Sequence, residues 1–257
     1  MITSSQNPKL KLARALQGRS RERHEAGAFL AEGVRLVEEA ANRQWGFRFV
    51  LYDETLSERG KSLVESLKLR GVECEDVSPS LMQSLSNTET SQGILAVLDL
   101  SPIPCPVSIT FLLIPDQVRD PGNLGTLLRT AWAAGVQAVF LPPETTDAFA
   151  PKVVRAGMGA HFHLPIHAMT WNEIERVCRQ ARLQVFLADM GGTSCWTTDL
   201  RPPLALIVGG EAQGASREAQ KLANARLSIP MPGGAESLNA GVAGAILMFE
   251  VCRQRGE

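Results

Sequence analysis

Two glycine-rich loops near the C-terminus carry polar residues that are well placed for chemistry. The strand-like run 204–210 leads into the loop 211–216, and the run 226–231 leads into a loop and then a helix. At such strand-to-helix turns, free backbone N–H groups and missing side chains let a ligand approach the chain closely. We expect the two loops to form one composite pocket, with Glu211, Ser237 and Asn239 as its candidate polar residues.

A third candidate region follows the strand-like run 111–116. The turn 120–123 precedes a predicted helix, for which Asn123 is a suitable N-cap. Arg129 lies among the apolar residues of that helix, and a buried arginine needs a partner. The partner is expected to be a carboxylate such as Glu211, or a phosphate of the ligand.

The predicted last helix, 238–252, has one apolar face and one face with almost no side chains. Helical spacing assigns to the apolar face Leu238, Val242, Ala245, Ile246 and Phe249. The small residues of the other face are Ala240, Gly241, Ala243 and Gly244. Each interior glycine costs about 1 kcal/mol relative to alanine, so close packing should offset it. This face packs either on the twin helix of a second chain or within the same chain, and Ser237 is the predicted N-cap.

Several common catalytic signatures are absent from the sequence. It contains no P-loop, no G-x-S-x-G, no H-E-x-x-H and no G-x-G-x-x-G motif. His161, His163 and His167 would share one face of a strand, but no acid or cysteine accompanies them locally. We therefore expect packing or surface positions for these histidines and no metal site.

Composition indicates a soluble α/β protein of the cytoplasm. The 257 residues are 44% hydrophobic and 21% charged, and no apolar run is long enough to span a membrane. The five scattered cysteines are expected to be reduced thiols. Net charge is −1, yet six basic residues and one acid lie within residues 1–24. That cluster is either an RNA-phosphate contact or an ordinary solvated helix face.

The chain divides at a proline-rich linker, 101–108. Residues 1–100 read as a small α/β domain that starts with a basic helix over 8–17. Residues 109–257 alternate near-continuous apolar strands with helices, which predicts a mostly parallel sheet buried on both faces.

With these residues in place, the chain resembles the SpoU/TrmH family of SPOUT methyltransferases over nearly its whole length. NLGTLLRTAWAAG, with Asn123 and Arg129, resembles the first family motif, and LIVGGEAQGAS, with Glu211, resembles the second. IPMPGGAESLNAGVAGAILMFE, with Ser237 and Asn239, resembles the third. The third motif usually continues with a β-branched residue and serine, where this chain has Ala240 and Gly241. Because this chain lacks the serine that the family usually has there, an accessory role of that serine is in doubt here.

The resemblance implies a fold, a cofactor and partners. The C-terminal domain would be trefoil-knotted and hold S-adenosylmethionine, and residues 1–100 would be an L30e-like domain that binds RNA substrate. The protein would be a homodimer packed through its last helix. The implied cofactor-binding residues are Leu187, Ala188, Gly209, Gly210, Ile229, Met231 and Leu238.

The implied reaction transfers a methyl group to a ribose 2′-OH, most simply in large-subunit rRNA. The implied catalytic residues are Asn123, Arg129, Glu211, Ser237 and Asn239. Because guanidinium does not normally release a proton, Arg129 either is activated by the target phosphate or orients that phosphate while another group accepts the proton. The alternatives are a tRNA ribose methyltransferase and a non-catalytic rRNA-binding assembly factor. The target nucleotide, and the choice between naked RNA and a ribosomal particle, stay open.

Overall fold

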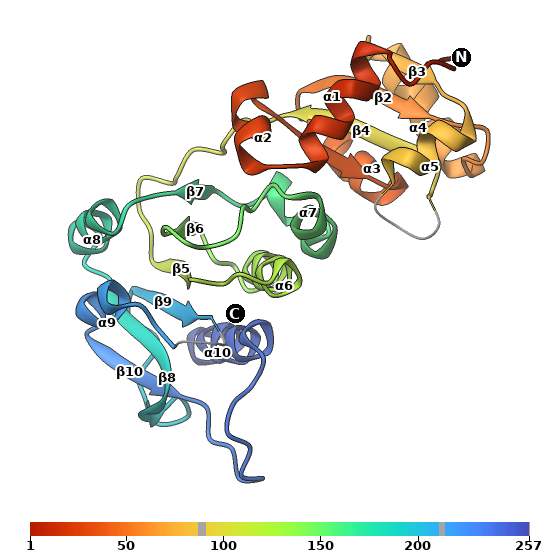
Figure 1. Ribbon diagram of the computed structural model, residues 1–257. Helices are drawn as coiled ribbons and strands as arrows, with labels where there is room; N and C mark the ends of the chain where they lie inside the picture. The colour runs from red at the N-terminus through yellow and green to blue at the C-terminus, as the bar shows by residue number, and fades with distance from the viewer. Residues whose placement is uncertain (87–90, 211–213, 257) are drawn as a thin grey trace. The chain divides into compact units, whose positions relative to one another are not determined.

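The computed structural model describes residues 1–86, 91–210 and 214–256. The chain forms two compact units (Figure 1). The first comprises Met1–Ser101 with Phe149–Phe162, and the second comprises Pro102–Ala148 with His163–Glu257. Among the described residues, no helix has the length and apolar character that a membrane span requires. All five cysteines are free thiols.

The first unit contains a four-stranded mixed sheet. Its strand order is β1 (Ala28–Glu32), β4 (Ile94–Asp99), β2 (Phe47–Tyr52) and β3 (Cys74–Asp76). β4 runs antiparallel to both of its neighbours, while β2 and β3 are parallel. The helices of this part of the chain are α1 (Pro8–Gln17), α2 (Ser20–Ala26), α3 (Val34–Asn42), α4 (Glu58–Leu69) and α5 (Pro79–Leu85). The basic helix over 8–17 is therefore confirmed, whereas α2 and α5 were not predicted.

The first unit also incorporates a segment from the middle of the chain, Phe149–Phe162, which contains α7 (Pro151–Gly157). Phe149 packs edge-on against Phe29 of β1, with ring centroids 5.0 Å apart. Phe162 meets Trp45 in the same manner at 5.3 Å. Arg155 of α7 forms an ion pair with Glu32 at 3.1 Å. Aromatic contacts of this kind stabilise beyond the area they bury, so the segment is part of this unit's core.

Only part of the N-terminal basic cluster is available to bind a phosphate. Arg23 is buried, and its guanidinium donates to the carbonyl oxygens of Leu16 and Gly18. Lys9 is held by Glu73 and Glu75. The members of the cluster that are exposed are Lys11, Arg19 and Arg21. The exposed residues of the cluster are compatible with either interpretation, a phosphate contact or a solvated helix face.

The second unit is built on a six-stranded, wholly parallel sheet. Its order is β10 (Ala225–Ser228), β8 (Gln184–Ser194), β9 (Leu204–Gly209), β5 (Phe111–Asp116), β6 (Ala138–Leu141) and β7 (Ile166–Ala168). Figure 1 shows α6 (Pro121–Ala133) beside α10 (Ala240–Arg255). Side chains of α8 (Trp171–Gln180) and α9 (Arg217–Leu222) join the sheet's main core. The predicted parallel sheet is confirmed.

The three clustered histidines do not share one strand face, so that expectation is wrong. His161 lies in the 3-10 turn Ala160–Phe162, whereas His167 lies in β7. His163 stacks on Trp132, with ring centroids 4.0 Å apart. A chain reversal between the turn and β7 breaks the alternation that the apolar pattern suggested. Within the described residues, no group of histidine, cysteine or acidic side chains is arranged to hold a metal ion.

The glycine-bearing face of α10 packs within the chain. A Cβ at Gly241 would lie 3.0 Å from Thr126, and one at Gly244 would overlap Leu127, so α6 occupies the space that the two glycines leave. The apolar face is the one turned to solvent, since Val242 is 46% exposed and Phe249 is 49% exposed. Of the two alternatives for the small-residue face, the structure selects packing inside the chain.

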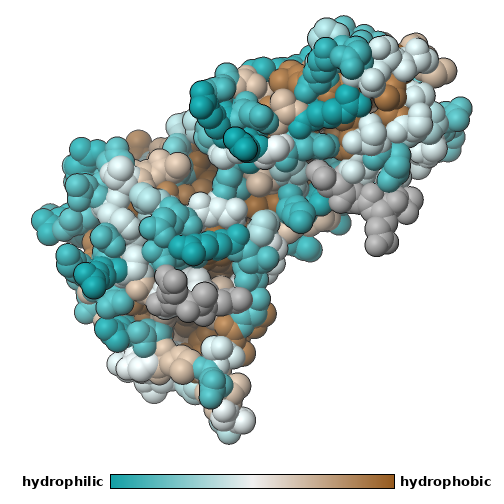
Figure 2. Space-filling view, viewed as in Figure 1, coloured by the Kyte–Doolittle hydropathy of each residue, from teal (hydrophilic) through white to brown (hydrophobic). Residues whose placement is uncertain are grey.

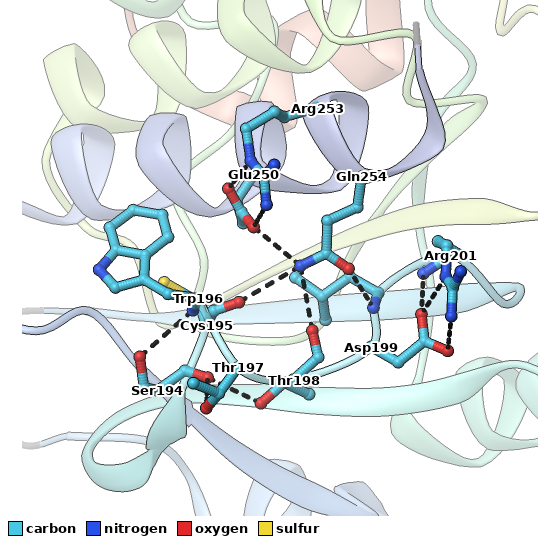
Figure 3. Close-up of polar contacts among 11 residues, drawn as sticks. Ser194, Cys195, Trp196, Thr197, Thr198, Asp199, Arg201, Glu250, Arg253 and Gln254 are labelled. Carbon is cyan, nitrogen blue, oxygen red and sulfur yellow. Dashed lines mark hydrogen bonds and ion pairs between the residues drawn. The ribbon is translucent and has the colours of Figure 1, made fainter.

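Gln254 ties the C-terminal end of α10 to the loop after β8 (Figure 3). Gln254 Nε2 donates to the carbonyl oxygen of Thr198 at 3.0 Å, and its Oε1 accepts from the N–H of Leu200 at 2.8 Å. The same amide donates to Glu250, a buried carboxylate that Arg253 also binds through two 2.8 Å bonds. These bonds, chiefly those from Arg253, lower the pKa of Glu250.

We predict that Gln254→Ala lowers the free energy of unfolding by about 2–3 kcal/mol, because several hydrogen bonds are lost and a backbone donor is left unpaired. Denaturant titration followed by circular dichroism measures this change. Gln180→Ala, at an exposed position of α8, is the matched control and should change stability by less than about 0.5 kcal/mol. Equal effects of the two substitutions would show that the Gln254 bonds do not hold the helix.

Candidate functional site

A pocket of about 380 Å³ lies beside the C-terminal ends of β9 and β10. We call it the carboxyl-edge pocket. From β5, the sheet extends through β6 and β7 on one side and through β9, β8 and β10 on the other. The pocket therefore lies near the point where the strand order reverses. Ligands of parallel α/β sheets bind at such switch points. The lining residues are Ala188, Asp189, Met190, Val208, Gly209, Gly210, Gly214, Ala215, Leu227, Ser228, Ile229, Met231, Ser237, Leu238, Ala240, Ala243 and Leu247.

Most of the positions predicted to bind a cofactor line this pocket. They are Ala188, Gly209, Gly210, Ile229, Met231 and Leu238. Leu187 does not line it, because that side chain is fully buried in the core beneath the sheet edge. Alternation along β8 explains the difference, since neighbouring residues point to opposite faces. The pocket therefore presents a mainly apolar wall with exposed backbone at its glycines.

Asp189 is the single charged side chain among the described lining residues. Its Oδ1 accepts from the N–H of Gly191 at 2.8 Å, and its Oδ2 lies 3.2 Å from Arg226. The carboxylate is thus partly neutralised by a neighbour. A largely apolar pocket with few polar groups suits a ligand that combines an aromatic ring with a short polar chain.

Two predicted polar residues from distant parts of the sequence meet directly. Asn239 Nδ2 donates to Asn123 Oδ1 at 2.7 Å. Asn239 is also the N-cap of α10, with its Oδ1 accepting from the N–H groups of Gly241 and Val242. Ser237 lines the pocket two residues earlier. The first and third motifs are therefore joined at the start of the last helix.

Both predicted N-caps are wrong by a few residues. Asp120 caps α6, accepting from the N–H of Asn123 at 2.8 Å, so Asn123 lies inside the first turn. The cap falls there because Pro121 suits the first helical position, where no N–H is needed. α10 is capped by Asn239 instead of Ser237. Neither Asn123 nor Ser237 therefore has the capping role that was expected for it.

Arg129 is exposed, which corrects the expectation that it is buried. The buried side of α6 consists of Leu124, Leu127, Leu128 and Ala131, and Arg129 lies off that side. Within the described part of the chain, its guanidinium has no recorded hydrogen bond or ion pair. Glu211, proposed from the sequence as its partner, lies outside the described residues. An exposed guanidinium can bind an incoming anion without first breaking an internal ion pair.

Asp116, at the end of β5, is an important residue that the sequence reading did not single out. Its side chain is 0% exposed, and its Oδ2 accepts from the N–H of Ser216 at 2.7 Å. Its carbonyl oxygen accepts from the N–H of Gly210 at 2.9 Å. Burial raises the pKa of this carboxyl, while hydrogen bonds from Ser216 act in the opposite direction. The signal in the sequence that could have identified Asp116 is an acidic residue at the end of an apolar strand-like run.

Gly210 has no room for a side chain, because a Cβ there would collide with the carbonyl group of Gln117. We predict that Gly210→Ala lowers the free energy of unfolding by about 1–3 kcal/mol, since a backbone segment must move. Gly233→Ala, in the loop before α10, is the control because nothing lies within 4 Å of its added Cβ. Chemical denaturation compares them, and an unchanged Gly210→Ala variant would contradict the close approach.

Comparison with known families assigns both parts of the chain. Residues 110–249 match the SpoU rRNA Methylase family, and residues 7–96 match an MRM3-like substrate binding domain. The 23S rRNA (guanosine(2553)-2′-O)-methyltransferase RlmP of Bacillus subtilis is 35% identical over 252 residues, which cover 97% of this chain and 98% of that protein. The 23S rRNA (uridine(2479)-2′-O)-methyltransferase of Streptomyces viridochromogenes is 30% identical, over 98% of this chain and 92% of that protein.

Solved structures agree with this assignment. The AdoMet-bound rRNA methyltransferase of Sinorhizobium meliloti has a TM-score of 0.86 and 32% identity, covering 98% of this chain and 97% of that one. The SpoU methyltransferase AviRb of Streptomyces viridochromogenes, in complex with AdoMet, has a TM-score of 0.86 and 28% identity over 97% of this chain and 99% of that one. The architecture is an N-terminal domain followed by a SPOUT domain, and the chain belongs to the SpoU rRNA methylase family.

Proposed function

We propose that this protein transfers a methyl group from S-adenosylmethionine to a ribose 2′-OH in large-subunit rRNA. The observation that carries the proposal is the Asn123–Asn239 contact, at a helix start whose next residue, Ala240, lines the carboxyl-edge pocket. It joins motifs that are 116 positions apart in the sequence. Relatives over nearly the whole chain are named as 23S rRNA 2′-O-methyltransferases, and similar structures contain AdoMet.

The carboxyl-edge pocket fits S-adenosylmethionine in chemistry. Ala188 and Leu238 offer apolar contacts for the adenosine, and the backbone at Gly209 and Gly210 offers hydrogen-bonding groups close to the ligand. When bound, the sulfonium supplies a methyl group that is already activated for transfer. The protein's task is therefore to hold the cofactor and the ribose hydroxyl in line.

The polar residues divide that task. We propose that Arg129 binds the phosphate of the target nucleotide, because its exposed guanidinium is a fixed cation that does not readily release a proton. The contact with Asn123 orients Asn239, and the pair with Ser237 positions the ribose. Glu211 is proposed to pair with an arginine or to take part in proton transfer, although it lies outside the described residues.

We propose that residues 1–100 form the L30e-like substrate domain and residues 109–257 the catalytic domain, with 101–108 as linker. The match of residues 7–96 to a substrate binding domain supports this division. The net charge of −1 favours a folded RNA or a ribosomal particle over nonspecific binding to RNA. Free cysteines are compatible with the proposed cytoplasmic location.

We also propose a trefoil-knotted homodimer. The dimer would use the apolar side of α10, where Val242 and Phe249 are exposed, together with Trp132 of α6, which is 39% exposed. In Figure 2, apolar surface reaches the outside of the second unit near α10. Exposed apolar side chains that gather on one patch mark association surfaces more often than isolated ones do. The glycine-bearing side of α10 is already covered by α6, so it is not the proposed interface.

Arg129→Ala is expected to lower methyl transfer by at least about 100-fold, since a charge-assisted contact to the target phosphate is lost. The assay follows tritium from S-adenosylmethionine into unmodified large-subunit rRNA, with bulk tRNA beside it. Thermal stability should be unchanged, because the side chain is exposed. The control is Arg217→Ala, which removes a charge at the first position of α9.

The other outcomes of that assay identify the alternatives. Label that enters tRNA alone would overturn the rRNA substrate while keeping the chemistry. Binding of S-adenosylmethionine without transfer to naked RNA would favour a particle substrate, which purified ribosomal subunits from an unmodified strain would test. No binding of S-adenosylmethionine would favour a non-catalytic rRNA-binding assembly factor.

The dimer proposal has its own test. Phe249→Glu places a charge on the proposed interface and should convert the protein to a monomer in light scattering at micromolar concentration. Met190→Glu is the matched control, because Met190 is also an exposed apolar residue, at 61%, but lies on β8 instead of α10. A wild-type protein that is monomeric at these concentrations would refute the interface.

A further inference from the structure

We infer that Asp116 is a positioning residue of the carboxyl-edge pocket: its buried carboxylate holds Ser216, which follows the wall residues Gly214 and Ala215. The inference rests on the proposed binding of S-adenosylmethionine. Asp116 does not line the pocket itself. It would act through two described residues that it binds, Gly210 and Ser216.

Asp116 makes one hydrogen bond to Gly210 and another to Ser216. The main-chain carbonyl oxygen of Asp116 accepts from the N–H of Gly210 at 2.9 Å, which continues the pairing of β5 with β9. The side-chain Oδ2 accepts from the N–H of Ser216 at 2.7 Å. The first bond is ordinary sheet pairing, and any residue could supply it. The second requires a short side chain with an acceptor oxygen, which Asp116 provides.

The wall held in this way is part of the pocket. Gly209, Gly210, Gly214 and Ala215 all line it. Ala215 approaches Gly209 closely, since a Cβ on Gly209 would lie 3.5 Å from the Cα of Ala215. By contrast, a Cβ on Gly214 would have nothing within 4 Å. Gly214 therefore has little packing of its own. Ala215 packs against the core and its carbonyl oxygen accepts from Gln220, so the bond to Ser216 is one of the restraints on this end of the wall.

Burying the carboxylate of Asp116 costs more free energy than a neutral hydrogen-bond acceptor would. Asp116 is fully buried, and its Oδ1 has no hydrogen-bond partner in the described structure. Burial raises its pKa, and the nearby charges of Glu218 and Glu144 raise it further. A buried acceptor without a partner is unfavourable for folding. Asp116 therefore adds little to net stability, and a role in positioning the wall accounts for its presence.

The wall can be released from either side of the Asp116–Ser216 bond. Asp116→Ala removes the acceptor, while Asp116→Asn retains an acceptor of the same shape. Ser216→Pro removes the donor N–H, and the backbone of Ser216, with φ −58° and ψ 159°, is one that proline adopts. Ser216→Ala is its matched control, because it keeps the N–H that donates the 2.7 Å bond and removes the hydroxyl, which caps α9 and also hydrogen-bonds the carboxyl of Asp116.

The measurement is the dissociation constant of S-adenosylmethionine, by calorimetry on the full-length protein, with S-adenosylhomocysteine as second probe. We expect Asp116→Ala and Ser216→Pro each to weaken both ligands about tenfold or more, which corresponds to about 1.4 kcal/mol. Asp116→Asn and Ser216→Ala should stay within about threefold of wild type. The double variant Asp116→Ala with Ser216→Pro should bind no more weakly than either single variant, because both remove one bond.

Two further readouts distinguish positioning from a general structural role. At saturating cofactor, kcat of Asp116→Ala should stay within about twofold while KM for S-adenosylmethionine rises, and its Tm should change little. Unchanged affinity in Asp116→Ala would overturn the inference, as would a fall in Tm that Asp116→Asn fails to rescue. A wild-type protein that does not bind S-adenosylmethionine would refute the proposed function itself, which is a separate result.

Discussion

The parallel pairing of β5 with β9 is the interaction on which the rest of the second unit depends. It aligns Asp116 with Gly209, so that two strands separated by nearly ninety residues of sequence end at the same edge of the sheet. Each strand then leads into a loop, and the loops must diverge because one strand is followed by α6 and the other by α9. The carboxyl-edge pocket lies beside the end of β9, the middle of β8 and the end of β10.

The same alignment explains why polar groups can be placed there at all. Strands buried on both faces have no solvent-facing positions for functional side chains, and all six residues of β5 are buried. Functional residues must therefore lie at strand ends and helix starts. Asn123 in the first turn of α6 and Asn239 at the cap of α10 both satisfy this requirement, and the packing of α10 on α6 brings them into contact.

Close packing of α10 depends on residues that contribute almost no side chain. Gly241 and Gly244 let α6 approach, and two of the apolar residues that helical spacing grouped together, Val242 and Phe249, are exposed. At the other end of α10, Gln254 satisfies backbone groups of the loop after β8 (Figure 3). A helix fixed at both ends in this way holds its N-terminal cap, and so Asn239, in a defined position beside the pocket.

Local patterns in the sequence determined which elements form and which loops carry chemistry. Apolar runs located the strands, glycine-rich turns located the loops, and most residues predicted to bind a cofactor do line the pocket. Short elements such as α2, α5 and β7 contain too few residues to show a hydrophobic periodicity in the sequence.

Tertiary structure decided the remaining features of the site. The exposure of Arg129 and the choice of the face of α10 that packs on α6 depend on which neighbour covers each side of a helix, and periodicity carries no such information. The role proposed for Asp116 likewise depends on the pairing of β9 with β5. That pairing brings the N–H of Ser216 within hydrogen-bonding distance of the carboxylate.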